Sequence, residues 1–373
     1  MTTSGDSVPF LDLGALHAEL GPELEAAALR VIRSARFLLG PELTGFEVAW
    51  AAAVGADHAV GVGSGLDALT LGLRALGVGP GDEVLVPSHT FIATWLAVVQ
   101  VGAVPVPVDV ETPVGDWAHG ALEAAVTPRT KAVVPVHLYG HPVDLDPVLE
   151  LARRHGLCVL DDAAQAHGAR YRDRPVGGLT HATAWSFYPG KNLGAFGDGG
   201  AVTTSDPETA RRLRSLRNYG STQKYVHEEI GWNSRLDEMQ AALLSVRLEH
   251  LGAHNARRAR AAQRYDEALS DVGHDLGLPQ TAEWATPAWH LYVVTSAHRD
   301  QLAAHLASQG VECNVHYPVP PHRQRAFAGT SAASADLPRA DELAGQVLSL
   351  PMGPHLTDAQ QDVVIEAVRG FRP

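Results

Sequence analysis

Lys191 lies in a glycine-rich bend, SFYPGKNLGAFGDGG (186–200), with almost no other charge nearby. A lysine in such a bend can clamp a phosphate, act as a covalent catalyst, or be an ordinary turn residue. A P-loop needs a glycine five residues before the Gly-Lys pair and a serine or threonine after the lysine. This chain has Trp185 and Asn192 at those two positions. The P-loop interpretation therefore fails.

A second glycine cluster, GVGSGLDAL (61–69), follows the strand-like run HAVGV and opens a predicted helix. Backbone N–H groups at a helix N-terminus can hold a phosphate. A dinucleotide-binding fingerprint requires glycine at position 66, where this chain has Leu66. The motif thus favours a single phosphate over a dinucleotide, and a capped helix start without a ligand is equally compatible with it.

The third candidate is LDDAAQAHG (160–168), in which Asp161 and Asp162 close an apolar strand. Ligands gather at the carboxyl ends of parallel strands. An aspartate at such a place can bind a metal, act as a base, or neutralise a buried cation. It can also be a simple helix cap.

Together, the three sites match the needs of pyridoxal phosphate: a lysine for its aldehyde, a carboxylate for its pyridinium nitrogen, and a phosphate cradle. Lys191 would join the aldehyde and, once displaced by an amino donor, carry the proton as a general base. A free lysine titrates near ~10.4, so burial and the cationic ring must keep its amine neutral.

Short β-rich runs alternate with helical ones in the first 200 residues, which predicts a mostly parallel sheet covered on both faces. The expected strands are 58–62, 83–87, 103–108, 131–137 and 157–163, and the expected helices are 91–100, 116–126 and 144–156. Asp144 is expected to cap the last of these helices and Gly156 to end it.

The alternation of short strands and helices ends after Gly200. Two long helices are expected at 235–251 and 254–271, and a smaller α+β arrangement follows. Its expected elements are strands at 290–297 and 311–318, helices at 299–310, 336–347 and 357–370, and a surface connection at 328–338. We therefore predict a large α/β domain (1–250), whose N-terminal segment packs on the small domain, and a small C-terminal domain (251–373).

The composition narrows the function classes. The chain has 373 residues, 45% of them hydrophobic, which suffices for one large or two ordinary domains. A formal net charge of −13 argues against nucleic acid or an anionic membrane as its main partner. The run 84–108 has no Asp, Glu, Lys or Arg, but Pro87, Gly102, Pro105 and Pro107 interrupt it. It therefore predicts strand, helix and strand rather than a membrane span.

Cys158 and Cys313 lie far apart in apolar contexts, so we expect buried free thiols, which fit a reducing cytoplasm. The N-terminus has neither the basic region nor the apolar core of a signal peptide, which also favours the cytoplasm. His137 and His141 have the HxxxH spacing of some zinc sites, but Gly140 argues against a helix presenting both, and we predict no metal.

Nearly from end to end, the chain resembles the sugar aminotransferases of the DegT/StrS family, which are fold type I pyridoxal-phosphate enzymes. The matching blocks are VPFLDL (8–13), LLGPEL (38–43), GSGLDAL (63–69), PSHTFIATW (87–95), PVHLYGHP (135–142), DDAAQAHGA (161–169), SFYPGKNLG (186–194), RNYGS (217–221), GWNSRLDEMQAA (231–242) and HYP (316–318) with a later histidine. Within the family, HLYGHP, FYPGKNLG, STQKY and HYPVP are closest to 3-aminotransferases of nucleotide-linked 3-keto-deoxysugars.

The resemblance implies a role for each matching residue around the cofactor ring. Lys191 would form the covalent link, and Asp162 would face the pyridinium nitrogen. Gln165 would approach the ring hydroxyl, and Phe91 would stack on the ring, where relatives often have Tyr or Trp.

For the phosphate, the resemblance implies Ser186 together with the backbone of Gly65 and Leu66. Asn233 would complete this site from the neighbouring subunit, so a homodimer with shared active sites is expected. Six further residues are candidates to meet the substrate: Tyr188, Lys224, Tyr225, Arg235, His316 and His322. A packing role for Tyr188, His316 and His322 and a solvated loop position for Lys224 are the alternatives.

The resemblance implies an aminotransferase that moves an amino group from L-glutamate to carbon three of a dTDP-linked 3-keto-6-deoxyhexose, in deoxyaminosugar and antibiotic biosynthesis. Relatives with histidine at the lysine position perform dehydration, whereas this chain keeps Lys191. A 4-keto sugar, a keto-cyclitol or another acceptor remains an alternative. A non-catalytic regulatory protein that binds pyridoxal phosphate is an alternative of another class.

Overall fold

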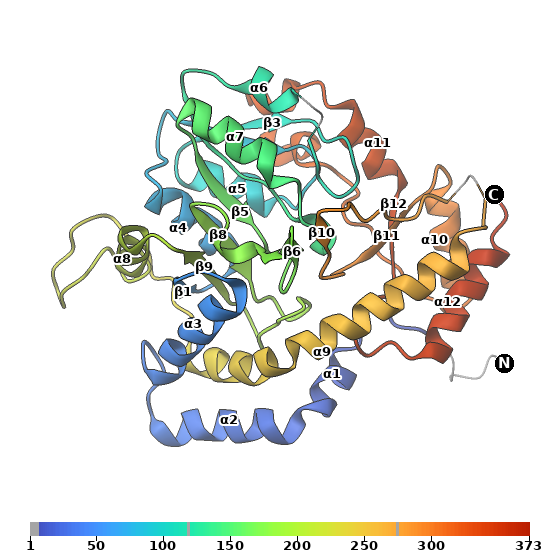
Figure 1. Cartoon of the computed structure of the whole chain (residues 1–373), viewed down its shortest axis with the longest axis horizontal. Helices are drawn as coiled ribbons and strands as arrows, with labels where there is room; N and C mark the ends of the chain where they lie inside the picture. Colours follow the sequence, from blue (N-terminus) through green and yellow to red (C-terminus); the bar gives the residue numbers. More distant parts are fainter. Residues whose placement is uncertain (1–6, 118–119, 274–275) are drawn as a thin grey trace.

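The computed structural model describes residues 7–117, 120–273 and 276–373. The strands of its main sheet are β1 (His58–Val62), β2 (Glu83–Pro87), β3 (Val104–Val108), β4 (Thr130–Val133), β5 (Cys158–Asp162), β8 (Ala182–Ser186) and β9 (Gly200–Thr204). They lie in the order β1-β9-β8-β5-β4-β2-β3 at the centre of the molecule (Figure 1). The strands from β8 to β3 are parallel, and β9 is antiparallel to both of its neighbours, β8 and the edge strand β1. The prediction of a mostly parallel sheet is confirmed.

Helices cover both faces of this sheet. On one face lie α4 (Gly65–Ala75), α5 (Ala93–Gln100) and α8 (Pro207–Leu216), packed on Val86 and Val202 among others. On the other face lie α3 (Pro41–Val54), α6 (Ala121–Ala125), α7 (Leu145–His155) and the first part of α9 (Glu238–Leu269), packed on side chains such as Leu85 and Ala201. Successive residues of one strand thus serve opposite faces, as the period of two requires.

The charge-free run 84–108 forms β2, α5 and β3, as predicted. Trp95 of α5 is fully buried, and its indole N–H donates to the Pro87 carbonyl at 3.0 Å. In the part of the chain that the structure describes, no helix combines the length and the apolar character of a membrane span.

The two long helices expected at 235–251 and 254–271 are in fact one, the 32-residue α9. Gly252 does not interrupt it, since a helical glycine costs only about 1 kcal/mol relative to alanine. The first half of α9 packs on α2 (Gly21–Ser34) and α3, and its second half packs on α12 (Asp358–Gly370) (Figure 1). The proposed domain boundary at residue 250 therefore falls inside a helix that both parts share.

The C-terminal part pairs β11 (Tyr292–Thr295) with β12 (Val347–Leu350) and covers them with α10 (Arg299–Ser308) and α12. The helix expected at 336–347 is α11 (Pro338–Gln346). The strand expected at 311–318 is wrong, because β12 takes the place beside β11. That segment makes only single bridges, from Val311 to Val8 and from Asn314 to Ser349. The first of these joins the N-terminal segment to the C-terminal part.

Two smaller predictions had mixed outcomes. Gly156 ends α7 in a left-handed conformation (φ 65°), as expected. Asp144 stands at the helix start, but its carboxylate accepts a hydrogen bond from the Tyr171 hydroxyl at 2.5 Å instead of from the helix backbone. The helix expected at 116–126 is the shorter α6, and residues 118–119 lie outside the described ranges.

The remaining elements lie around this frame. They are α1 (Leu13–Glu19) and a small sheet of β6 (Arg170–Tyr171), β7 (Arg174–Pro175) and β10 (Ala285–Thr286). The expected connection at 328–338 contains a short 3-10 turn, Ser331–Ser334.

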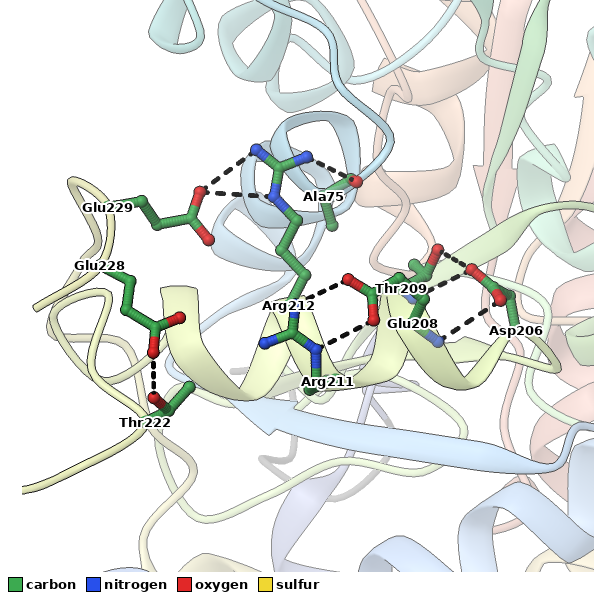
Figure 2. Close-up of polar contacts among 9 residues, drawn as sticks. All are labelled: Ala75, Asp206, Glu208, Thr209, Arg211, Arg212, Thr222, Glu228 and Glu229. Atoms are coloured by element: carbon green, nitrogen blue, oxygen red, sulfur yellow. Dashed lines mark hydrogen bonds and ion pairs between the residues drawn. The ribbon is translucent and has the colours of Figure 1, made fainter.

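The segment 217–237, between α8 and α9, extends from the body of the molecule (Figure 1). Figure 2 shows how α8 holds it near its base: Arg212 donates to one Glu229 carboxylate oxygen at 3.3 and 3.2 Å. The same guanidinium donates to the carbonyl of Ala75 in α4 at 3.0 Å. The projecting segment is therefore anchored to the sheet domain.

Candidate active site

A cavity of about 630 Å³ opens at the carboxyl ends of the parallel strands. The loop after β2 brings Phe91 to it, the loop after β5 brings Gln165, and the loop after β8 brings Tyr188. Lys191 and Asp162 line the same cavity. This edge of an open α/β sheet is the usual place for a ligand.

The bend around Lys191 is fixed by its neighbours. Asn192 donates to the Asn255 side chain of α9 at 2.9 Å and to the Ala288 carbonyl at 2.7 Å. Gly194 is required, because a Cβ there would lie 2.3 Å from the Pro189 carbonyl oxygen. These contacts hold Lys191 at the cavity, so it is not an ordinary turn residue.

Burial lowers the pKa of the Lys191 amine to about 8, and the nearby Asp162 carboxylate opposes part of that shift. At pH 7, about a tenth of the amine is therefore uncharged, far more than for an ordinary lysine. An uncharged amine is the form that attacks an aldehyde or accepts a proton.

Asp162 is buried, and burial raises the pKa of its carboxyl group. The Thr94 hydroxyl of α5 donates to Oδ2 at 2.8 Å, and the Ala164 N–H donates to Oδ1 at 3.2 Å. These donors favour the ionised form but do not balance its charge. A cation beside this carboxylate would do so.

The start of α4 approaches Ser186 at the end of β8. A Cβ on Gly65 would lie 2.5 Å from the Ser186 Cβ, so only glycine fits. The Ser64 hydroxyl accepts the Asp67 N–H at 3.0 Å. The first N–H groups of a helix, here those of Gly65 and Leu66, have no partner inside it. With the Ser186 hydroxyl they form a cradle suited to a phosphate.

Two side chains are placed to meet a flat ring between the cradle and Lys191. Phe91 is 52% exposed, and its ring centre lies 5.3 Å from that of Tyr317. The Gln165 amide accepts the Tyr139 N–H at 2.6 Å and donates to the Tyr317 hydroxyl at 3.0 Å. Because an amide nitrogen carries two hydrogens, Gln165 keeps one to offer to a ligand oxygen.

Two of the six predicted substrate residues, Tyr188 and His316, line the cavity. Burial and the Lys191 charge lower the pKa of His316 to about 4, so it is neutral. His322 does not line it: its ring is buried, with Nε2 3.1 Å from an Asp341 carboxylate oxygen.

The residues predicted on the segment 217–237 do not line the cavity of their own chain. Lys224 lies over the exposed Tyr225 ring, 5.0 Å from its centre. Arg235 donates to the Asn218 side chain at 3.1 Å, and Asn233 is exposed.

Two residues of the site, Thr94 and Arg258, were not predicted from the sequence. Thr94 holds Asp162 but lies in an apolar helix where nothing in the residue pattern marks it. Arg258 lines the cavity but stands among several arginines of α9. Only the three-dimensional packing separates it from its exposed neighbours.

A lysine of lowered pKa, a buried carboxylate beside it, and a phosphate cradle at the same sheet edge define a fold type I pyridoxal-phosphate transferase. The sequence model of the DegT/DnrJ/EryC1/StrS aminotransferase family matches residues 19–369, and the chain belongs to that family. It is an aminotransferase.

The comparisons with individual proteins agree. The chain is 57% identical to dTDP-3-amino-3,4,6-trideoxy-alpha-D-glucose transaminase of Streptomyces venezuelae, over 97% of this chain and 95% of the relative. The crystal structure of S. venezuelae DesV in complex with a ketimine intermediate is also 57% identical, with a TM-score of 0.95 over 98% of each chain. Bacillus subtilis NtdA with bound cofactor PMP is 31% identical, with a TM-score of 0.92 over 98% of this chain and 85% of that one.

The cofactor of the chain is pyridoxal phosphate, and the residues present fit it. The cradle of Gly65, Leu66 and Ser186 suits its phosphate, and Asp162 suits its ring nitrogen. Gly65 lets the start of α4 come close to Ser186, which places both at the cradle.

Proposed function

We propose that this aminotransferase moves an amino group from L-glutamate to carbon three of a dTDP-linked 3-keto-6-deoxyhexose. The observation that carries the proposal is Lys191 in one cavity with Asp162 and the Gly65 cradle. The S. venezuelae relative, named as a transaminase of a dTDP-3-amino sugar, supports the choice of acceptor. The reaction belongs to deoxyaminosugar biosynthesis, as in antibiotic pathways.

When bound, pyridoxal phosphate supplies an aldehyde that takes up the amino group and a ring that accepts electrons from the reacting carbon. Asp162 would keep the ring nitrogen protonated, and the hydrogen bond from Thr94 favours the ionised form of Asp162. Phe91 and Gln165 orient the ring. The Gly65–Ser186 cradle fixes its other end.

Lys191 moves the proton. Its amine would take a proton from the donor carbon in one half-reaction and return one to the acceptor carbon in the other. Its pKa of about 8 suits both directions, since the amine is partly protonated and partly neutral near neutral pH.

The active unit that we propose is a homodimer. Asn233 of one chain would complete the phosphate cradle of the other, and Lys224, Tyr225 and Arg235 would reach the partner's nucleotide diphosphate. The exposed side chains of the projecting segment support this proposal, because Tyr225 and Ile230 are each 84% exposed. Exposed apolar residues outside it, which a second copy would cover, are Phe37, Leu38, Leu39 and Phe196.

We propose the cytoplasm as the location of the enzyme. Cys158 and Cys313 are both free, as expected of a protein in a reducing compartment.

The decisive experiment is the absorbance of the purified protein, followed by product analysis with a small panel of 3-keto and 4-keto nucleotide sugars. A yellow band that glutamate bleaches, and that a dTDP-linked 3-keto sugar restores, is the expected result. Restoration only by 4-keto sugars would contradict the proposed acceptor. A band unchanged by glutamate and by other amino acids would favour a regulatory role.

A further inference from the structure

Arg258 is a buried cation in the wall of the active-site cavity. It projects from α9, is 2% exposed, and lines the cavity together with His290, Asn314 and Met352. Burial lowers the pKa of its guanidinium only to about 10, so it stays protonated at neutral pH.

The hydrogen bonds of Arg258 leave one edge of the guanidinium free. Nη1 faces the carbonyl oxygens of Trp289 (3.3 Å), His290 (3.2 Å) and Met352 (3.5 Å). Nε is buried without any partner, and among the described residues no acceptor is bonded to Nη2. Nε and Nη2 form the edge that binds a carboxylate through two parallel hydrogen bonds.

No carboxylate within the described ranges pairs with this charge. Buried Arg217, by contrast, forms an ion pair with Glu47. The histidines around Arg258 are neutral and so leave its charge unchanged, because burial and nearby cations keep the pKa of His290 well below 6.5 and that of His355 at about 4. An unpaired buried cation is costly unless a ligand supplies the opposite charge.

We infer that Arg258 binds a carboxylate of the amino-acid donor, and of the 2-oxo acid that the donor becomes. This inference rests on the proposed function, because it assigns the donor site of the same cavity. The cofactor phosphate has its own cradle on α4 and β8, whereas Arg258 and its neighbours come from α9 and the C-terminal part. A nucleotide diphosphate has two bulky charged groups and matches Arg258 poorly. The free edge of Arg258 offers two N–H groups from one almost inaccessible side chain, which match the two oxygens of a single carboxylate.

The test is the affinity of the holoenzyme for glutarate, which has both carboxylates of glutamate but no amine, measured by calorimetry. Arg258→Met should weaken glutarate binding about 10- to 100-fold, as loss of charge-assisted hydrogen bonds implies. The KM for glutamate should rise in parallel. The reaction of the pyridoxamine form with the keto sugar should keep its rate and KM.

Arg247→Met is the matched control. Arg247 is also on α9 and also buried, and no described residue gives it an acidic partner, but its guanidinium bonds to the Gly194 carbonyl and lies over Phe196. Its loss should leave glutarate affinity unchanged. If Arg258→Met does not fold, Arg258→Lys keeps the cation for the three carbonyls while losing the two-pronged edge, and it should still weaken glutarate binding.

Unchanged glutarate affinity in a folded Arg258 variant would overturn the inference, even if glutamate bleaches the cofactor band. A different result would contradict the proposed function alone: the wild-type protein binds glutarate through Arg258, but glutamate does not bleach the cofactor band.

Discussion

The two sides of the cavity are built differently. On the sheet side, strand ends and the start of α4 hold Asp162, Ser186 and Gly65, and neighbouring atoms fix each of them. On the other side, the second half of α9 and the C-terminal part line the cavity, and Arg258 lies there buried without a full set of partners. The first arrangement suits a permanent cofactor, and the second suits ligands that come and go. We therefore expect the sheet side to hold the cofactor and the side of Arg258 to meet the amino donor.

The largest effect is expected from Lys191→Ala, on the sheet side. Without the amine, neither the covalent link nor the proton transfer is available, so turnover should fall by at least about 10⁴-fold. Steady-state assays would measure this, with thermal unfolding to confirm a native fold. Normal turnover in the folded variant would contradict the role of Lys191, and with it the proposed difference between the two sides of the cavity.

Asp162→Asn should come next. An amide cannot keep the ring nitrogen protonated, so the rate should fall about 10²- to 10⁴-fold while some cofactor still binds. Absorbance of the dialysed protein reports the bound cofactor, and single-turnover kinetics report the rate. A rate close to wild type would mean that another group supplies the charge.

Gly65→Ala tests the cradle by geometry. The added methyl would lie 2.5 Å from the Ser186 Cβ, so cofactor affinity should drop at least about tenfold and the protein should lose stability. Gly45→Ala is the control, because a Cβ at that helical position meets nothing within 4 Å. It should stabilise the protein by about 0.5–1 kcal/mol.

The pH dependence tests the environment of Lys191. Its pKa is lowered to about 8, and the neutral amine is the active base. The rate of the half-reaction from the pyridoxamine form should therefore rise about tenfold per pH unit below 8 and level off above it. A profile that is flat between pH 6 and 9 would contradict the assignment of Lys191 as the base.

The smallest effect is expected from Thr94→Val, which removes one hydrogen bond to Asp162. That bond favours the ionised carboxylate, so its loss should raise the pKa of Asp162 further. Activity should fall about tenfold, and the additional acid limb caused by protonation of Asp162, distinct from that of Lys191, should move to higher pH. An unshifted acid limb would show that Thr94 has only a packing role.

Much of the sheet domain could be predicted from sequence, for physical reasons. Buried parallel strands are continuous apolar runs, so the strands at 83–87 and 157–163 could be predicted, and the glycines at 61–65 indicated the helix start. The break expected inside α9 and the strand expected at 311–318 were wrong, because packing partners far along the chain decided both.

The residues on the substrate side of the cavity could not be predicted in the same way. Arg258 differs from Arg257 and Arg260 only in the direction it takes from α9, which the spacing of residues does not reveal. The contacts of Asn233 and Tyr225 depend on a second chain in our proposal. Their roles therefore stay predictions.

The central claim is that Lys191 carries the cofactor. Borohydride reduction of the yellow holoenzyme, followed by peptide mass mapping, tests it most directly. We predict that the cofactor is found attached to Lys191 and to no other lysine. Attachment elsewhere, or a yellow protein that yields no labelled peptide, would contradict the account.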